Sequence, residues 1–203
     1  MTLPSTERKS DEDLVQGIIA GDPQALEALF RRYNRNLVAF AQLYVRNPAV
    51  AEELVQEVYF NIWRQRGGWN PRGSLRAYLY GAVRNHAANR VRERRVRAKW
   101  REEAGPGAVH GAATSRGPDA DLQFREMIGA IERVLDEMPP RQRVVFTLSR
   151  HQGLSYAEIA AVLNISRKTV EAHMGRALAL LRTRLAPLLG GSTRPRNRAG
   201  ERT

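Results

Sequence analysis

The chain contains no cysteine, which excludes disulfide bonds, thiol catalysis and zinc sites built on cysteine. Lysine is scarce and occurs only at positions 9, 99 and 168, so nearly all of the 33 basic residues are arginine. No apolar run approaches the roughly 20 residues that a membrane-spanning helix requires. The first residues, MTLPSTERKSDED, contain no apolar signal core. We therefore expect a cytoplasmic protein without a membrane anchor.

Sequence signals for catalysis are also missing. The histidines His86, His110, His151 and His173 lack metal-ligand spacing with each other or with acidic residues. Neither the phosphate-binding loop G-x-x-x-x-G-K-[ST] nor the serine motif G-x-S-x-G occurs. We expect the protein not to be an enzyme and to need neither a cofactor nor a metal.

Positive charge is what the chain has in abundance, with a formal net charge of +12 and a pI of about 11.0. A net charge this positive favours a polyanionic partner. Nucleic acid is the first candidate and an anionic membrane is the second. Arginine suits bidentate contacts to phosphate and guanine, although an excess of arginine also follows from GC-rich codon usage. Hydrophobic residues make up 42% of the chain, which is enough for one or two small domains with cores.

Helical periodicity and cap signals predict an all-α first half. We expect helices over 11–20, 23–45, 48–66 and 75–97, begun by Ser10, Asp22–Pro23, Asn47–Pro48 and Ser74. One stripe of the second helix is expected to face the core: Leu26, Leu29, Phe30, Tyr33, Leu37, Phe40 and Ala41. The third helix has more apolar positions than one core can bury, next to an acidic patch of Glu52, Glu53, Gln56 and Glu57. This face suggests a protein partner, the alternative being a buried helix with solvated glutamates.

Residues 101–120 are rich in glycine and proline and predict a flexible linker. Further helices are expected over 122–138 and 141–151, followed by a helix-turn-helix, and residues 189–203 are expected to form a disordered basic tail. The predicted fold is therefore two small helical domains, over residues 10–100 and 121–188.

The most informative segment is GLSYAEIAAVLNISRKTVEAHMGRALALLR, residues 153–182. Ser155 and Glu158 have the spacing of a capping box, Asn164 tolerates the left-handed conformation of a tight turn, and Ser166 is a good cap for the next helix. A capped basic helix of this kind fits the major groove of duplex DNA. Its outer face would carry Arg167, Lys168, Glu171, Ala172, His173 and Arg176. The alternative is an ordinary helical hairpin with a solvated charged face.

A tryptophan stands in the glycine-rich loop RGGWNPRG ahead of a basic helix. Trp69 is either a lid on the core, which the residues alone favour, or a platform that stacks on a base. The following helix carries basic, amide and aromatic side chains that suit an unstacked single strand: Arg76, Tyr80, Arg84, Asn85, Asn89 and Arg92. A solvated basic face is the alternative here. The arginine-rich run at 90–101 would add contacts to phosphate that do not depend on sequence.

Together these segments resemble the extracytoplasmic-function (ECF) sigma factors, compact members of the sigma-70 family of bacterial transcription initiation factors, over residues 11–185. AEELVQEVYFNIW is similar to the region 2.2 motif that grips the clamp helices of RNA polymerase. GSLRAYLYGAVRNHAANRVRERR resembles the segment that melts and reads the −10 element. Residues 138–182 are similar to region 4, which reads the −35 element as duplex and touches the polymerase flap.

The resemblance implies roles for individual residues. Core polymerase would be bound by Glu53, Leu54, Gln56, Glu57 and Trp63. On the melted −10 strand, Trp69 would line the pocket of a flipped base and Asn85 would read its edge. At the −35 element, phosphates would meet Arg167, Lys168 and Thr169, and bases would face Glu171, Ala172, His173 and Arg176. An anti-sigma factor is expected as a further partner.

Two other function classes compete with this interpretation. A stand-alone regulator of the response-regulator type is one, because ISRKTVEAHMGRAL also resembles that group; it predicts a dimer on a palindrome. It leaves the Trp69 loop and the acidic-apolar helix unexplained. An RNA-binding adaptor would account for the charge but not for the capped recognition helix.

Overall fold

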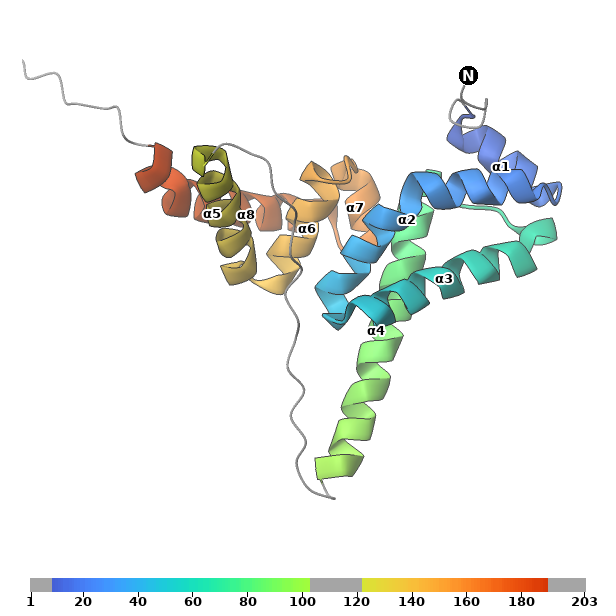
Figure 1. The fold of residues 1–203 in the computed structure, drawn as a ribbon, viewed down its shortest axis with the longest axis horizontal. Coiled ribbons are helices and arrows are strands. Elements are labelled where there is room, and N and C mark those ends of the chain that lie inside the picture. Colours follow the sequence, from blue (N-terminus) through green and yellow to red (C-terminus); the bar gives the residue numbers. More distant parts are fainter. Residues whose placement is uncertain (1–8, 103–121, 190–203) are drawn as a thin grey trace, which may run out of the picture.

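The computed structural model describes residues 9–102 and 122–189, and this part of the chain is helical without any strand (Figure 1). The all-α prediction is therefore confirmed. Most of the predicted linker and the predicted tail, residues 103–120 and 190–203, lie outside the described residues. Arg101 and Glu102, which the composition assigned to the linker, instead complete the last turn of a helix.

The first domain consists of α1 (Asp11–Ile19), α2 (Pro23–Val45), α3 (Pro48–Arg64), the short 3-10 helix η2 (Arg66–Gly68) and α4 (Leu75–Glu102). Its helices begin where the cap signals predict. Ser10 forms a capping box with Asp13, and the side chains of Asp22 and Asn47 accept backbone N–H groups ahead of a proline in the first turn. Ser74 Oγ accepts the N–H of Ala77 at 3.2 Å and so caps α4.

Helix α2 is the centre of this domain, because α1, α3 and α4 all pack against it. Its predicted apolar stripe is buried except at two positions. Leu26 is half-buried, and Phe30, at the edge of the stripe, is 41% exposed and contacts the tilted ring of Tyr59 with 5.2 Å between centroids. The prediction that Phe30 faces the core was therefore wrong, because a residue at the edge of a helical stripe is buried only where a neighbouring element covers it.

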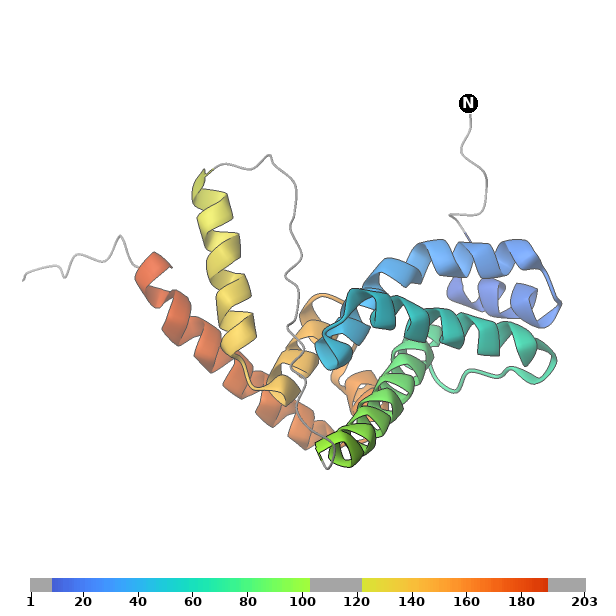
Figure 2. The ribbon, with the colours of Figure 1, turned by 60° about the horizontal axis from the view of Figure 1, so that its bottom comes forward.

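The second domain consists of α5 (Leu122–Glu137), α6 (Pro140–Arg150), α7 (Tyr156–Leu163) and α8 (Arg167–Leu189). Helix α8 is its longest element and contacts each of the other three, as Figure 2 shows. Helices α6 and α7 pack on its first half, and α5 packs on its second half beyond them (Figures 1 and 2).

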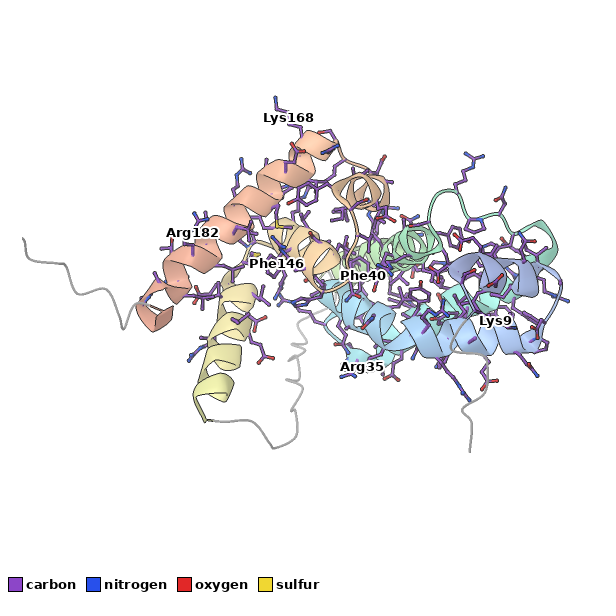
Figure 3. The ribbon with its side chains drawn as sticks, turned by 90° about the horizontal axis from the view of Figure 1, so that it is seen from above. Lys9, Arg35, Phe40, Phe146, Lys168 and Arg182 are labelled. Atoms are coloured by element: carbon purple, nitrogen blue, oxygen red, sulfur yellow. The ribbon has the colours of Figure 1, made fainter. Side chains whose placement is uncertain are left out.

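The two domains touch one another. Helix α7 packs on α4 and α6 packs on α2, so one continuous cluster of buried side chains extends from Leu14 to Ala177. In Figure 3, Phe40 of α2 and Phe146 of α6 lie on either side of this junction. The composition of the sequence predicted a linker between the domains but contained no sign that they dock.

Candidate nucleic-acid and polymerase interfaces

The helix-turn-helix forms as its cap residues predict. Helix α7 begins with a reciprocal capping box, in which the N–H of Ser155 donates to Glu158 Oε2 at 2.8 Å and the N–H of Glu158 donates to Ser155 Oγ at 3.3 Å. It ends at Asn164, which adopts the left-handed conformation with φ 53° and ψ 52°. Ser166 Oγ then accepts the N–H of Thr169 at 3.1 Å and caps α8.

The outer face of α8 is open to solvent along its first three turns. Arg167, Lys168, Glu171, Ala172 and Arg176 are all exposed. Lys168 projects away from the body of the protein in Figure 3. Arg167 Nε lies 3.1 Å from Glu171 Oε1, in an exposed pair that contributes little stability and leaves both groups free to turn towards a ligand.

Two of the predicted −35 residues are less accessible than the others. The Thr169 hydroxyl lies 2.8 Å from that of Ser166, so it supports the start of α8. His173 is half-buried, and its Nδ1 is buried without a hydrogen-bond partner among the described residues. It lines a cleft of about 490 Å³ between the domains, together with Arg84 and Arg141. His173 therefore lies at the edge of the outer face of α8, next to the domain junction.

The outer face of α4 is partly covered by the second domain. Asn85, Asn89 and Arg92 are exposed. In contrast, Tyr80 is 1% exposed, and its hydroxyl donates to Gln152 Oε1 at 2.6 Å. Arg76 Nη1 donates to the carbonyl oxygen of Gln152 at 3.1 Å. Two of the predicted −10 residues therefore bind the loop ahead of α7.

Trp69 is 6% exposed and lies in extended backbone directly after η2. Its ring makes an edge contact with Tyr78, with 5.7 Å between centroids. Its Nε1 atom is buried and has no acceptor in the described part of the chain. Of the two predicted alternatives, this conformation corresponds to the lid on the core. Stacking of Trp69 on a base therefore requires the loop that carries it to move away from the core.

A groove of about 420 Å³ runs between α4 and α7. Asn85, the residue expected to read a flipped base, lines it together with Tyr78, Ala82 and His86 of α4. The opposite wall is formed by Ala161 and Val162 of α7. Asn85 therefore borders a space that the second domain closes on one side.

The acidic patch on α3 is partly neutralised within the domain. Arg90 Nη2 lies 2.8 Å from Glu53 Oε1 and 3.3 Å from Glu57 Oε1, and His86 Nδ1 lies 3.2 Å from Glu57 Oε2. Gln56 is exposed on the same face. Leu54 is 1% exposed and belongs to the core, so it supports this surface from beneath without contributing side-chain area to it.

Two phenylalanines extend the α3 surface in a way that the sequence analysis missed. Phe60 is 64% exposed, and Phe30 on α2 is 41% exposed. Phe60 follows Glu53, Gln56 and Glu57 at helical spacing, which was the signal that could have revealed it. Trp63, one turn away, is half-buried under the guanidinium of Arg66, which lies 4.6 Å from the ring centroid. Exposed aromatic rings next to polar residues are typical of protein-binding surfaces.

The described residues contain no group of three or more histidine, aspartate or glutamate side chains placed to hold a metal ion. Burial raises the pKa of Tyr33 to about 12, helped by its hydrogen bond to Asp11, so that phenol stays neutral near pH 7. None of the helices in the described ranges is long and apolar enough to cross a membrane.

Comparisons with known proteins agree with the two-domain arrangement. The family model for Sigma-70 region 2 matches residues 29–97, and that for Sigma-70, region 4 matches residues 128–181. The chain is 31% identical over 182 residues to the ECF RNA polymerase sigma factor SigM of Mycobacterium tuberculosis, covering 90% of this chain and 86% of that one. It is 24% identical over 187 residues to the RNA polymerase sigma-H factor of Pseudomonas aeruginosa, covering 90% of this chain and 97% of the relative.

Two solved structures share the fold. One is CnrH in complex with the cytosolic domain of CnrY, with a TM-score of 0.58 and 22% identity, covering 91% of this chain and 100% of that one. The other is the sigma factor RpoE in complex with the anti-sigma factor NepR from Bartonella quintana, with a TM-score of 0.58 and 23% identity, covering 82% and 98%.

Proposed function

The chain belongs to the ECF RNA polymerase sigma factors, and from this premise we propose that its two domains divide promoter recognition between them. The first domain, residues 10–100, binds core polymerase and the melted −10 strand. The second, residues 121–188, reads the −35 element as duplex and touches the polymerase flap. The protein acts in the cytoplasm by binding alone, with no chemistry performed by its own side chains.

The observation that carries this proposal is the open outer face of α8. A capped helix whose first turns expose Arg167, Lys168 and Arg176 can enter a major groove without any rearrangement of the domain. Arg167, Lys168 and Thr169 hold the phosphates. Glu171, Ala172 and Arg176 meet base edges, and His173 contributes from the edge of the helix.

The −10 strand is read by the outer face of α4. Asn85 hydrogen-bonds the edge of a flipped base, and Trp69 lines its pocket once the loop has lifted. Arg76, Tyr80, Arg84, Asn89 and Arg92 hold the strand around that base. Contacts to the extruded bases offset the few kcal/mol that unstacking costs.

Core polymerase binds the exposed face of α3. Glu53, Gln56 and Glu57 supply the polar part of this face, with Trp63 at its edge and Leu54 beneath it. Phe60 adds the apolar anchor, because a side chain with 64% of its area exposed has that area available for burial against a partner.

An anti-sigma factor is a further proposed partner. Both similar solved structures are complexes: one joins CnrH to the cytosolic domain of CnrY, and the other joins the sigma factor RpoE to the anti-sigma factor NepR. The same fold in this chain provides the surfaces that such a partner would cover.

Reconstitution with core polymerase on a genomic library, with transcript starts mapped, tests the proposed function. Promoter-dependent initiation is the expected result. DNA binding without initiation would instead support the stand-alone regulator, whose predicted dimer on a palindrome would be seen in the stoichiometry of the complex.

The polymerase surface is tested separately by Phe60→Asp. A charged group at an apolar anchor is expected to weaken binding to core polymerase by about 2 kcal/mol or more. Phe60→Leu is the matched control and should retain most of the affinity. Equal binding by both variants and the unchanged chain would remove Phe60 from the interface.

A further inference from the structure

The cleft of about 490 Å³ between the domains has the size of a small-molecule site, since such sites span about 300–1,000 Å³. Its first wall comes from α2 and α4, with Tyr44 and Ala88. Its second wall comes from the second domain, with Val144 of α6, Leu163 at the end of α7 and Ile165 in the following turn. The apolar body of a small molecule would be buried between these two walls.

The charge in this cleft is of one sign. The described residues that line it include Arg84 and Arg141 but no aspartate or glutamate. Neither arginine is paired with a carboxylate in the described part of the chain. Their neighbours differ, because Arg90 on α4 pairs with a glutamate and Arg143 on α6 pairs with an aspartate. Two guanidinium groups without a carboxylate suit a carboxylate or a phosphate on a ligand.

Two further polar groups lie in the walls. Burial raises the pKa of Tyr44 to about 12, although the nearby Arg84 acts in the opposite direction, so the hydroxyl is a neutral hydrogen-bonding group near pH 7. His173 Nδ1 is buried without a partner among the described residues. Most buried polar atoms in proteins have a partner, so a ligand that supplied one would remove the cost of burying this nitrogen.

We propose that the cleft binds a small amphipathic anion. The carboxylate or phosphate of the ligand lies between the guanidinium groups of Arg84 and Arg141, and its apolar body packs on Val144, Leu163 and Ile165. The arginines determine that the ligand is an anion, and the apolar walls determine that it is not a bare ion. This site does not depend on the proposed function, because neither DNA nor polymerase takes part in it.

Isothermal titration calorimetry on the full chain tests the site with three probes of similar shape. Two are anions, 1-naphthyl phosphate and 1-naphthoate, and the third is the neutral 1-naphthalenemethanol. Each anion should bind once per chain and about tenfold more tightly than the alcohol, which is the effect of one charge-assisted hydrogen bond. The anion that binds more tightly identifies the preferred head group.

The variant Arg141→Gln tests the charged part of the site. It should weaken the binding of both anions about tenfold and leave the binding of the alcohol unchanged. Arg150→Gln is the matched control, because Arg150 is exposed at the end of the same helix and does not line the cleft. Both variants lower the net charge by one, so a general attraction to the basic chain would fall equally in both.

The variant Ala88→Leu tests the apolar part. The larger side chain occupies space in the cleft and should weaken the binding of all three probes about fivefold. Ala161→Leu is its control, because Ala161 lies on α7 and lines the other groove.

Three results would overturn the site. One is equal affinity for the anions and the alcohol. Another is equal binding by the variant and its control in either pair. The third is binding of 1-naphthyl phosphate at several equivalent positions per chain, which would show a general attraction to the basic surface.

Discussion

The outer faces of α8 and α4 carry similar side chains but have different surroundings. Both follow a serine cap, and both present arginine and other polar groups on one side. On α8 these groups meet solvent, whereas on α4 Arg76 and Tyr80 are bonded to Gln152. Whether a polar helix face is accessible therefore depends on which element packs against it, and not on its composition alone.

The difference also matches the two forms of DNA that the faces are proposed to bind. Duplex is present before any rearrangement, so a permanently open α8 can find it. A melted strand exists only after polymerase has engaged the promoter, so the outer face of α4 does not need to be accessible before that point.

Tyr80→Ala should have the largest effect, because this side chain is buried at the domain junction. Its ring packs edge-on against Phe40 with 5.0 Å between centroids, so truncation leaves a cavity. We expect the free energy of unfolding to fall by about 3–5 kcal/mol, measured by denaturant titration. Tyr80→Phe keeps the ring and loses only the bond to Gln152, about 1 kcal/mol. Equal losses for both variants would mean that the hydroxyl, and not the packing, dominates.

Arg176→Ala tests the open face. We expect binding to the preferred −35 duplex to weaken by about 1–3 kcal/mol and specificity there to relax. The measurement is fluorescence anisotropy on preferred and scrambled duplexes. An equal loss on both duplexes would reduce Arg176 to a phosphate contact.

Trp69→Ala tests the covered face. Binding to the −35 duplex should be spared, whereas promoter opening should weaken by about 1–3 kcal/mol, the usual value of stacking one base on an aromatic ring. Permanganate reactivity of thymines at the −10 element measures opening. Because Trp69 is also a lid on the core, thermal unfolding of the variant must be followed in parallel. Normal reactivity in a folded variant would leave Trp69 with its structural role alone.

The two serine caps give the smallest and most direct comparison. Ser166→Ala should cost about 1 kcal/mol of stability, because it removes the cap of α8 together with the bond to the Thr169 hydroxyl. Ser74→Ala removes the cap of α4 and also the bond to Glu158. It should therefore cost a similar amount of stability, and denaturant titration measures both losses. A loss for Ser74→Ala far below that for Ser166→Ala would contradict the contribution of the Ser74 hydroxyl.

Much of the local structure was predictable from the sequence. The cap residues Ser10, Asp22, Asn47, Ser155 and Ser166 start helices where expected, because each satisfies backbone N–H groups only a few residues away. The left-handed turn at Asn164 also follows from a property of that residue. The predicted end of α4 was too early, since an arginine-rich helix has no breaker until the glycines and prolines beyond residue 102.

The candidate site was predictable in its residue types but only partly in its exposure. Leu54 and Trp69 were assigned to binding surfaces by resemblance and lie in the interior in this conformation. Phe30 was placed in the core by periodicity and is 41% exposed, because periodicity defines the apolar face of a helix and not the neighbours that cover it.

The sequence by itself determined the helices, their starts and the polar face of the recognition helix, because these depend on contacts within one or two turns. Only the tertiary structure decided which faces are free. The bond from Tyr80 to Gln152 joins residues 72 positions apart, and no local pattern encodes such a pairing. It arises because the two domains bury apolar area and satisfy polar groups against one another, and the free energy gained depends on their three-dimensional shapes.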